Sequence, residues 1–543
     1  MKRVVRVVVG MAMLVPVLGG ASSAVAAGSA MSSGLSWGPC PVSSPAASSK
    51  TETETADSGT AIGRSAPAVS GVECASVRVP LDYNEPLGQS ITLALNRIKA
   101  KVPREGDYLG PLLVNPGGPG ASGRSLAEYV SATLSQKAAD RYDIIGFDPR
   151  GVGNSEPAMH CVDPAVYYAA PRPDAVPRDE EDEKVLLGRA SEYASRCGDL
   201  YAWLLPYLTT ENTARDMDSI RTALGEPQIS FLGYSYGTYI GAVYATLFPD
   251  RVKHLVLDST VDPDGVWYKA NLAQDRAFER RHRAFLAWTA KNNAVYKLGG
   301  SLTQTSFAWY AMRSRLHDRP AAGVVGPSEL DDAFTVAGYT DRIWPDLAAA
   351  WSRYVRQADA KALVDVYNKY GKPDADEENG YAIYLSVQCR DAQWPRSWDK
   401  WRTDMTRVYR QAPFLTWSNA WYNAPCAFWP IPAGTPVKIN ASKRLPPILM
   451  IQSKDDAATP YQGALNMRKL FPSARMVVDA GGNHGSSLSG NQCVDRHLVA
   501  YLVDGTLPRH TANCDKLPAP KPTAHMAALR PLGHERRTEL LAR

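Results

Sequence analysis

Short apolar runs that end in glycine-rich or acidic turns recur in two parts of this chain. Two segments with alternating apolar and polar positions, Cys74–Pro80 and Ile91–Ile98, are typical of strands. The runs that follow are continuously apolar, which favours parallel strands buried on both faces of a sheet. They lie at Pro111–Asn115, Tyr142–Asp148, Ile229–Gly233, His254–Asp258, Pro447–Ser453 and Ala474–Asp479.

Helical periodicity separates several of these runs. The segment Thr213–Leu224 spaces its apolar residues three and four positions apart, which puts them on one helical face. Tyr236–Phe248 is a second helical segment and is followed at once by a proline. Strands that alternate with helices predict an α/β fold with a mostly parallel sheet and crossover connections.

A long segment without strand-like runs interrupts this pattern. Residues 261–446 are rich in Trp, Tyr, Ala, Lys and Arg, and we expect them to form a mostly helical cap over the carboxyl edge of the sheet. A smaller insertion, at about residues 160–205, follows the run at Tyr142–Asp148. The α/β core is therefore expected in two parts, at 74–260 and 447–514.

The N-terminus has the features of a secretory signal. Basic residues precede an apolar stretch over residues 4–19, and Ala24-Val25-Ala26 follows, so residues 1–27 are predicted to be a signal peptide. A membrane anchor is the alternative, but the apolar stretch is short and contains Pro16. Later in the chain no stretch of about 18 residues is apolar throughout. We therefore expect a secreted, extracellular protein without membrane association after signal cleavage.

Two further segments are expected to lack regular structure. The N-terminal segment 28–73 is predicted to be partly flexible, because Ser, Ala, Thr, Pro and Gly predominate between Cys40 and Cys74. Residues 515–543 carry prolines and basic residues and are predicted to form a flexible tail.

Composition and charge narrow the class of protein. Hydrophobic residues make up 45% of the chain and charged residues 21%, which is sufficient for a large globular core. The formal net charge is +5, and Lys2, Arg3 and Arg6 of the predicted signal contribute three of these charges. The remaining chain is close to neutral, so nothing in its charge indicates a nucleic-acid partner.

The chain has eight cysteines, an even number that favours disulfides in an exported protein. Their spacing forms four sequential couples, and we expect neighbours to pair in order, although sequence alone does not determine connectivity. Metal binding is the alternative, but there is no close Cys-x-x-Cys and no histidine among them, so no metal is expected. The couples are Cys40 and Cys74, Cys161 and Cys197, Cys389 and Cys426, and Cys493 and Cys514.

The main chemical signal is Gly233-Tyr234-Ser235-Tyr236-Gly237, which matches Gly-x-Ser-x-Gly. It lies between an apolar run and a helical segment, where this motif forms a strained strand-to-helix turn that exposes the serine hydroxyl. A glycine-rich turn with an ordinary serine is the alternative, which this context disfavours. We therefore predict that Ser235 is a nucleophile.

A serine nucleophile needs a base, and the base is held by an acid. In hydrolases that carry the Gly-x-Ser-x-Gly motif in this context, the three catalytic residues follow the chain order Ser, acid, His. His484 lies in a small-residue loop after the last apolar run, although a lone loop histidine is more often a solvated surface residue. Asp455 and Asp456 both follow the run at Pro447–Ser453, and the residues alone do not choose between them.

Acyl transfer also needs hydrogen-bond donors for an oxyanion. The Tyr236 backbone N–H, at the start of a helix, is one candidate. The loop Asn115–Gly120 reads Asn-Pro-Gly-Gly-Pro-Gly, and its Gly118 N–H is the second candidate. Arg150 follows another strand and is expected either to brace the site or to have a structural role.

These motifs together resemble the prolyl-aminopeptidase-like serine peptidases, and most closely the secreted tripeptidyl aminopeptidases of Streptomyces. The resemblance runs from roughly Cys40 to Cys514. It departs in the Ser-rich segment before Cys74 and in the basic tail. The motifs that carry it are Asn115–Gly120, Phe147–Gly151, Gly233–Gly237, Tyr236–Asp250, Glu378–Gly380 and Gln452–Tyr461 with its Asp456-x-x-Thr459-Pro460.

The resemblance implies a capped α/β-hydrolase fold and an exopeptidase that releases short peptides, typically tripeptides, from free N-termini. It makes Asp456, rather than Asp455, the acid of the triad and places Thr459 beside it as a supporting residue. It implies no cofactor. Peptides or proteins with free N-termini are then the expected partners, and the cap should supply a carboxylate for their ammonium group. Glu378 is the first candidate and Glu377 the second, although a solvated acidic loop is the alternative for this run.

Two other functions remain open at this stage. A secreted esterase or lipase uses the same fold, because fold does not determine substrate. An apolar funnel in the cap would favour the lipase, and carboxylates there would favour the exopeptidase. A binding protein on an inactive hydrolase scaffold is the third possibility, which the presence of Ser, Asp and His disfavours.

Overall fold

A computed structural model describes residues 35–41 and 71–524; the predicted signal peptide and most of the segment 28–73 lie outside these residues. Ten strands form one sheet in the order β1-β2-β3-β5-β4-β6-β7-β8-β9-β10. They are β1 (Gly38–Pro39), β2 (Val72–Pro80), β3 (Ser90–Ile98), β4 (Gly110–Asn115), β5 (Tyr142–Phe147), β6 (Ile229–Tyr234), β7 (Val252–Asp258), β8 (Leu449–Ser453), β9 (Arg475–Asp479) and β10 (Ala512–Cys514).

The sheet is mostly parallel, as the continuous apolar runs predict. Strands β4 to β10 pair in parallel, whereas β1, β2 and β3 form an antiparallel extension that joins β5. Sequence patterns did not indicate β1 or β10, because strands of two and three residues carry no periodicity.

Helices cover both faces of the sheet. Alternate residues of the strands enter two apolar clusters, one shared with α5, α6 and α17, the other with α1 and α18. This two-sided burial is the reason that the strands are apolar throughout. The helices of this part are α1 (Gly123–Thr133), α2 (Gln136–Ala139), α5 (Thr210–Ala223), α6 (Tyr236–Leu247), α17 (Tyr461–Leu470) and α18 (Gln492–Asp504).

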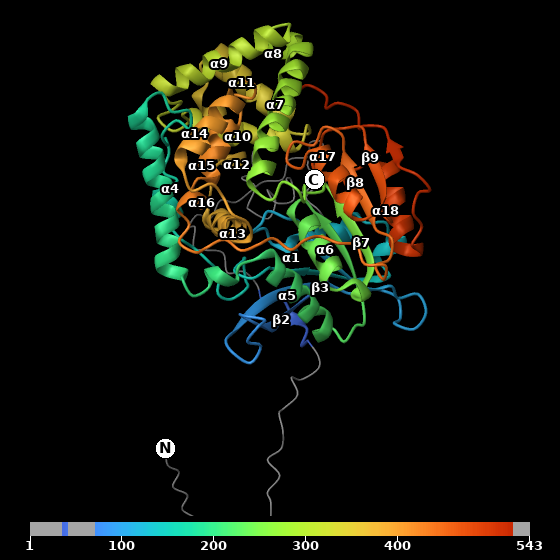
Figure 1. Cartoon of the computed structure of the whole chain (residues 1–543). Helices are drawn as coiled ribbons and strands as arrows, with labels where there is room; N and C mark the ends of the chain where they lie inside the picture. Colours follow the sequence, from blue (N-terminus) through green and yellow to red (C-terminus); the bar gives the residue numbers. More distant parts are fainter. Residues whose placement is uncertain (1–34, 42–70, 525–543) are drawn as a thin grey trace, which may run out of the picture.

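The segment between β7 and β8 is helical, as predicted, and has an apolar core of its own built around Phe285, Trp309 and Trp351. Figure 1 shows its helices gathered on one side of the molecule and the sheet on the other. They are α7 (Tyr268–Lys291), α8 (Asn293–Tyr296), α9 (Leu302–Asp318), α10 (Pro327–Tyr339), α11 (Trp344–Gln357), α12 (Ala360–Tyr370), α13 (Ala375–Asp391), α14 (Trp398–Tyr409), α15 (Thr416–Asn423) and α16 (Pro425–Phe428).

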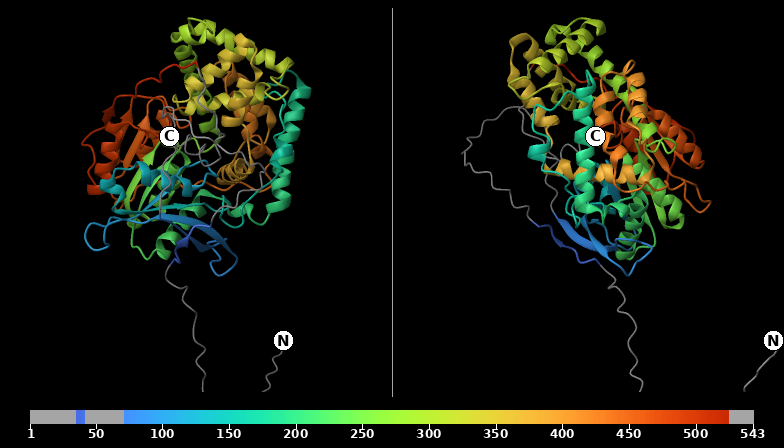
Figure 2. Two further views of the ribbon diagram at one scale, coloured as in Figure 1. Left: turned by 180° about the vertical axis from the view of Figure 1, so that it is seen from behind. Right: turned by 60° about the vertical axis from the view of Figure 1, so that its left-hand side comes forward.

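The smaller insertion packs against the same helical layer. It contains α3 (Pro164–Tyr167) and the long α4 (Glu180–Tyr201), and α4 contacts α15 and α16. The three views agree that α4 runs along the side of these helices (Figures 1 and 2). Two insertions that are separate in sequence therefore form one cap.

Four disulfides join the cysteine pairs expected from their order: Cys40–Cys74, Cys161–Cys197, Cys389–Cys426 and Cys493–Cys514. They close loops of 21 to 37 residues, and bonds of this kind typically contribute about 2–4 kcal/mol each. Two lie in the cap, where one closes the smaller insertion and the other ties α13 to α16.

The described part of the C-terminal tail is held in place, which differs from the flexible tail that the sequence indicates. The Trp288 indole N–H donates to the Pro520 carbonyl oxygen at 3.2 Å. The Thr523 N–H donates to the Tyr296 hydroxyl, also at 3.2 Å. These contacts are with α7 and α8, and the sequence of the tail alone does not predict them. Within the described residues, none of the helices is long and apolar enough to span a bilayer.

Candidate active site

Ser235 lies in a strained turn between β6 and α6. Its backbone has φ 55° and ψ −126°, a combination that a non-glycine residue adopts only at a cost of about 1–3 kcal/mol. The two glycines of the motif are required for space, because a Cβ on Gly233 would lie 2.5 Å from the Gly237 carbonyl oxygen. A Cβ on Gly237 would lie 2.7 Å from the Asn115 carbonyl oxygen. The motif therefore forms the strand-to-helix turn that its context predicts.

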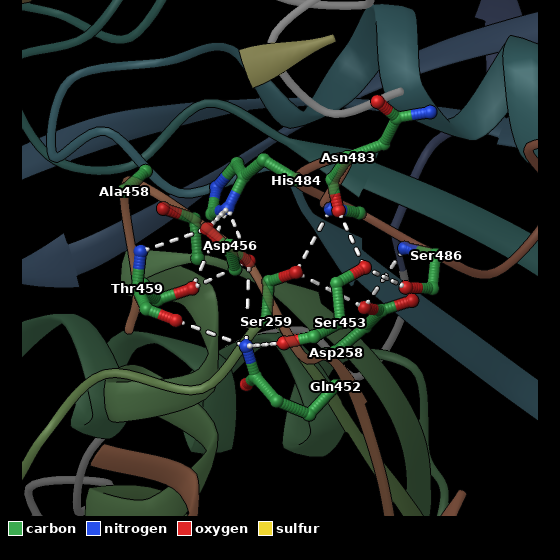
Figure 3. A network of polar contacts seen from close by, with 12 residues as sticks. Asp258, Ser259, Gln452, Ser453, Asp456, Ala458, Thr459, Asn483, His484 and Ser486 are labelled. Atoms are coloured by element: carbon green, nitrogen blue, oxygen red, sulfur yellow. Dashed lines mark hydrogen bonds and ion pairs between the residues drawn. The ribbon is translucent and has the colours of Figure 1, made fainter. Parts of the chain in front are cut away.

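His484 and Asp456 form a buried pair. The His484 Nδ1 lies 2.9 Å and 3.0 Å from the two carboxylate oxygens of Asp456. The Thr459 N–H and hydroxyl donate to the same carboxylate, both at 3.0 Å, and the Gln452 amide lies 3.4 Å from it (Figure 3). With Nδ1–H directed at the carboxylate, the Nε2 of His484 is left as the basic nitrogen.

Asp455 has a different environment, although it is adjacent in sequence. Its side chain is exposed, whereas Asp456 is 1% exposed. The backbone N–H of Asp455 donates to the Gly481 carbonyl oxygen at 3.0 Å. The geometry thus brings Asp456, and not Asp455, to His484.

A cavity of about 650 Å³ lies between the sheet and the cap. Ser235, Tyr236, Gly118, Thr459 and His484 all line it. Its other walls include aromatic side chains from α3, α7, α10, α12, α13 and α15, beside small and polar residues. The side chains needed for acyl transfer therefore meet at one cavity, which is where a substrate would be desolvated.

The loop after β4 packs against the nucleophile turn. A Cβ on Gly117 would lie 2.8 Å from the Tyr236 backbone nitrogen and 2.9 Å from the Ser235 Cβ, so only glycine allows this approach. The Asn115 side chain accepts from the Gly117 N–H at 2.9 Å and holds the loop. Gly118 follows with φ +99° and lines the cavity. Gly118 of this loop and Tyr236 at the start of α6 thus both line the cavity that Ser235 lines.

Arg150 does not line the cavity; the structure assigns it the structural alternative. Its guanidinium is 1% exposed and pairs with the fully buried Asp216 of α5 at 2.6 and 2.8 Å. It also donates to the carbonyl oxygens of Leu81 and Tyr207. Arg150 therefore joins the loop after β5 to α5 and to the end of the smaller insertion.

Replacing Arg150 by methionine is expected to destabilise the protein by about 3–5 kcal/mol, because Asp216 would remain as a buried carboxylate without its cation. Urea unfolding followed by circular dichroism measures this loss. Arg215→Ala is the control, since its pair with Glu211 is partly exposed and is worth at most about 1 kcal/mol. A loss below 1 kcal/mol for the Arg150 variant contradicts the prediction.

The two glutamates named for the substrate amine lie in different environments. Glu378 is fully buried and does not line the cavity. Its carboxylate accepts from the Cys161 N–H at 3.0 Å and the Tyr193 hydroxyl at 2.8 Å, and it contacts His160 at 3.0 Å. Glu378 therefore joins α13 to the smaller insertion. Glu377, one residue earlier, does line the cavity.

Several residues of the site had no signal in the sequence. Tyr339 of α10 accepts the His484 N–H at 2.8 Å through its carbonyl oxygen, and its ring packs edge-on against the imidazole. Asn483 exchanges hydrogen bonds with Asp341 of the cap. Neither pair lies in a recognisable motif, because each contact joins residues more than a hundred positions apart.

The fold and the site together define a hydrolase. A mostly parallel sheet carries a serine in a strand-to-helix turn, and a His–Asp pair follows from later strands. Residues 110–490 match the family described as alpha/beta hydrolase fold. The chain is 43% identical over 463 residues to the tripeptidyl aminopeptidase of Streptomyces lividans. The aligned residues make up 83% of this chain and 85% of that protein.

Two further relatives cover a similar part of the chain. The serine protease Hip1 of Mycobacterium tuberculosis is 31% identical over 461 residues, 82% of this chain and 87% of that protein. Carboxylesterase B of Mycobacterium tuberculosis is 32% identical over 456 residues, 81% of this chain and 86% of that protein. The chain belongs to the α/β-hydrolase superfamily and, within it, to the serine peptidase family that includes the Streptomyces tripeptidyl aminopeptidases.

Proposed function

We propose that this serine peptidase is a secreted exopeptidase that releases tripeptides from free N-termini through a Ser235–His484–Asp456 triad. The observation that carries the proposal is the buried His484–Asp456 pair on the wall of the cavity that Ser235 also lines. The relatives named tripeptidyl aminopeptidase support the product length. The predicted signal peptide and the four disulfides support export.

In this mechanism Ser235 attacks the scissile carbonyl carbon while the Nε2 of His484 takes the serine proton. The Tyr236 and Gly118 N–H groups hold the oxyanion that forms. His484 then gives the proton to the leaving amine, and water hydrolyses the acyl-enzyme by the same route. Asp456 holds the imidazole tautomer and stabilises its charged form, and Thr459 holds Asp456.

The cap supplies candidates for holding the substrate's ammonium group. Burying that group is costly unless a carboxylate meets it. Among the described residues, three acidic ones line the cavity: Asp262, Asp332 and Glu377. Glu377 lies in the first turn of α13, within the acidic run where the resemblance implies such a carboxylate.

The position of Glu377 suits a short substrate. One turn later on α13, the Gly380 carbonyl oxygen lies so close to Gly120 that a Cβ there would be 2.2 Å away. The loop that carries Gly118 therefore touches α13 at Gly380. The backbone of Glu377 lies about 4.5 Å from Gly380 along the helix axis. We propose that Glu377 binds the amine and so limits the number of residues that reach Ser235.

Glu377→Gln is expected to raise KM for free-amine tripeptide substrates about tenfold or more, because the ammonium ion would lose its counter-charge. The preference for free over N-acetylated tripeptides should disappear with it. Steady-state kinetics on chromogenic tripeptides, free and N-acetylated, measure both. Asp376→Asn is the matched control, since Asp376 lies in the same helical turn but is exposed and outside the cavity. A Glu377 variant that rejects N-blocked peptides as strongly as the wild type places the amine elsewhere.

An esterase is the second candidate function, because one relative is named carboxylesterase B and several aromatic side chains line the cavity. A panel of one-, two- and three-residue chromogenic peptides, free and N-blocked, beside p-nitrophenyl esters separates the two. Fastest turnover of free tripeptides supports the exopeptidase. Turnover of esters without any peptide cleavage supports the esterase.

A further inference from the structure

Asp258 and Ser259, at the carboxyl end of β7, lie beside the loop that carries His484 (Figure 3). Strand β7 is the neighbour of β6 in the sheet. The Asp258 carbonyl oxygen accepts the Ser235 N–H at 3.0 Å, which ties this peptide unit to the nucleophile. The Ser259 N–H donates to the Ile451 carbonyl oxygen on β8, the strand that precedes Asp456.

The side chains of the same two residues hold the histidine loop. The Gly485 N–H donates to the Ser259 hydroxyl at 2.8 Å. The next two N–H groups, of Ser486 and Ser487, donate to the two oxygens of the Asp258 carboxylate at 3.1 and 2.7 Å. The three consecutive backbone N–H groups after His484 therefore all donate to the side chains of Asp258 and Ser259. The His484 N–H itself is held by the cap, through Tyr339.

The Asp258 carboxylate is held by donors rather than by a cation. Its side chain is fully buried, and among the described residues no ion pair includes it. Burial raises the pKa of Asp258 to about 6, and the hydrogen bonds from Ser487 and Ser486 oppose that rise. A buried carboxylate is costly, so a residue that only filled space would be better replaced by an apolar one.

A carboxylate suits this place because both of its oxygens accept. An asparagine of the same shape would direct an N–H₂ group at one of the two loop N–H groups, so that a donor would face a donor. The loop would have to move, or one buried N–H would lose its partner. The side chain at this position must therefore be charged and must accept with both of its terminal atoms. The N–H groups that it accepts belong to the backbone immediately after His484, the proposed base.

We propose that Asp258 and Ser259 are positioning residues, which set His484 in register with Ser235 by binding the nucleophile turn through one peptide unit and the histidine loop through their side chains. This rests on the triad of the proposed function. Neither residue touches substrate. Since a displacement of about 1 Å at a reacting group can cost about 100-fold in rate, a small shift of this loop has a large effect.

The test compares Asp258→Asn with wild type, using a p-nitrophenyl ester and a free tripeptide substrate. Turnover is counted per active site, with the sites titrated by a fluorophosphonate. We expect kcat per titrated site to fall about 10- to 100-fold on both substrates, with KM within about twofold. A residue that only stabilises the fold would reduce the titrated fraction and the melting temperature, but not kcat per site.

Asp143→Asn is the control, since Asp143 is also a buried carboxylate of the sheet that accepts a backbone N–H, but it lies on β5 outside the cavity. It should keep its kcat per site. Should Asp258→Asn not fold, Ser259→Ala decides, because it removes the hydroxyl that accepts the Gly485 N–H and donates to the Asp258 carboxylate, and it should lower kcat several-fold. A folded variant of either residue with wild-type kcat per site overturns the proposal. Wild-type protein that turns over the ester but not tripeptides overturns the proposed function alone, and the ester arm still tests the positioning.

Discussion

Replacing Ser235 by alanine is expected to lower kcat by about 10⁴- to 10⁶-fold while the protein keeps its fold. The hydroxyl is the attacking group of the proposed mechanism, and without it only the oxyanion donors and substrate binding remain. The fold should survive because the turn is held by backbone contacts, such as the Ser235 N–H to Asp258 carbonyl bond at 3.0 Å. Hydrolysis of a chromogenic tripeptide measures the loss, and circular dichroism checks the fold.

The matched control is Ser230→Ala, which changes a serine on β6, the strand that precedes the turn, and Ser230 does not line the cavity. This variant should keep its activity. Labelling of both variants with a fluorophosphonate adds a direct test of the nucleophile. If the reagent modifies the Ser235→Ala protein as efficiently as the wild type, another residue is the nucleophile.

Asp456→Asn should lower kcat by about 10⁴-fold with little change in KM. An asparagine can direct its amide at the Nδ1 of His484 and hold the imidazole in the tautomer that carries the proton on Nε2, where it is no longer a base. The variant should still bind substrate, because the substitution changes the tautomer of His484 and leaves the other residues that line the cavity unchanged. Steady-state kinetics at the pH of maximal wild-type activity measure kcat and KM separately.

Asp455→Asn is the matched control, since it changes a neighbouring carboxylate that is exposed to solvent. It should behave almost as wild type. Equal losses in the two variants would leave the acid unassigned, and a larger loss in the Asp455 variant would make Asp455 the partner of His484.

The class of protein could be predicted from contiguous residues. The strand-to-helix turn at Ser235 depends on neighbouring positions, because the glycines two residues either side provide the space that the turn needs. The parallel strands could be predicted for a similar reason, since a strand buried on both faces is apolar at each position. The predicted strand Ile229–Gly233 differs from the observed β6 by a single residue at one end.

Contacts between distant segments were beyond the reach of the sequence. The two insertions form one cap because α4 packs against α15 and α16, and the last described residues bind α7 and α8. Asp258 and Ser259 appeared only as the end of a strand, and their relation to His484 depends on a loop more than 200 positions later.

The acidic run at the start of α13 shows most clearly the difference between what the sequence determines and what the tertiary structure decides. The family resemblance implied an amine-binding carboxylate in the cap, with two adjacent glutamates as the candidates. Adjacent residues on a helix point about 100° apart, so the rotation of α13 against its neighbours directs Glu377 into the cavity and Glu378 toward Cys161 and Tyr193. That rotation is determined by packing between segments far apart in the chain. The sequence by itself therefore determined the chemistry and the class of the enzyme, and only the tertiary structure decided which of the two glutamates lines the cavity.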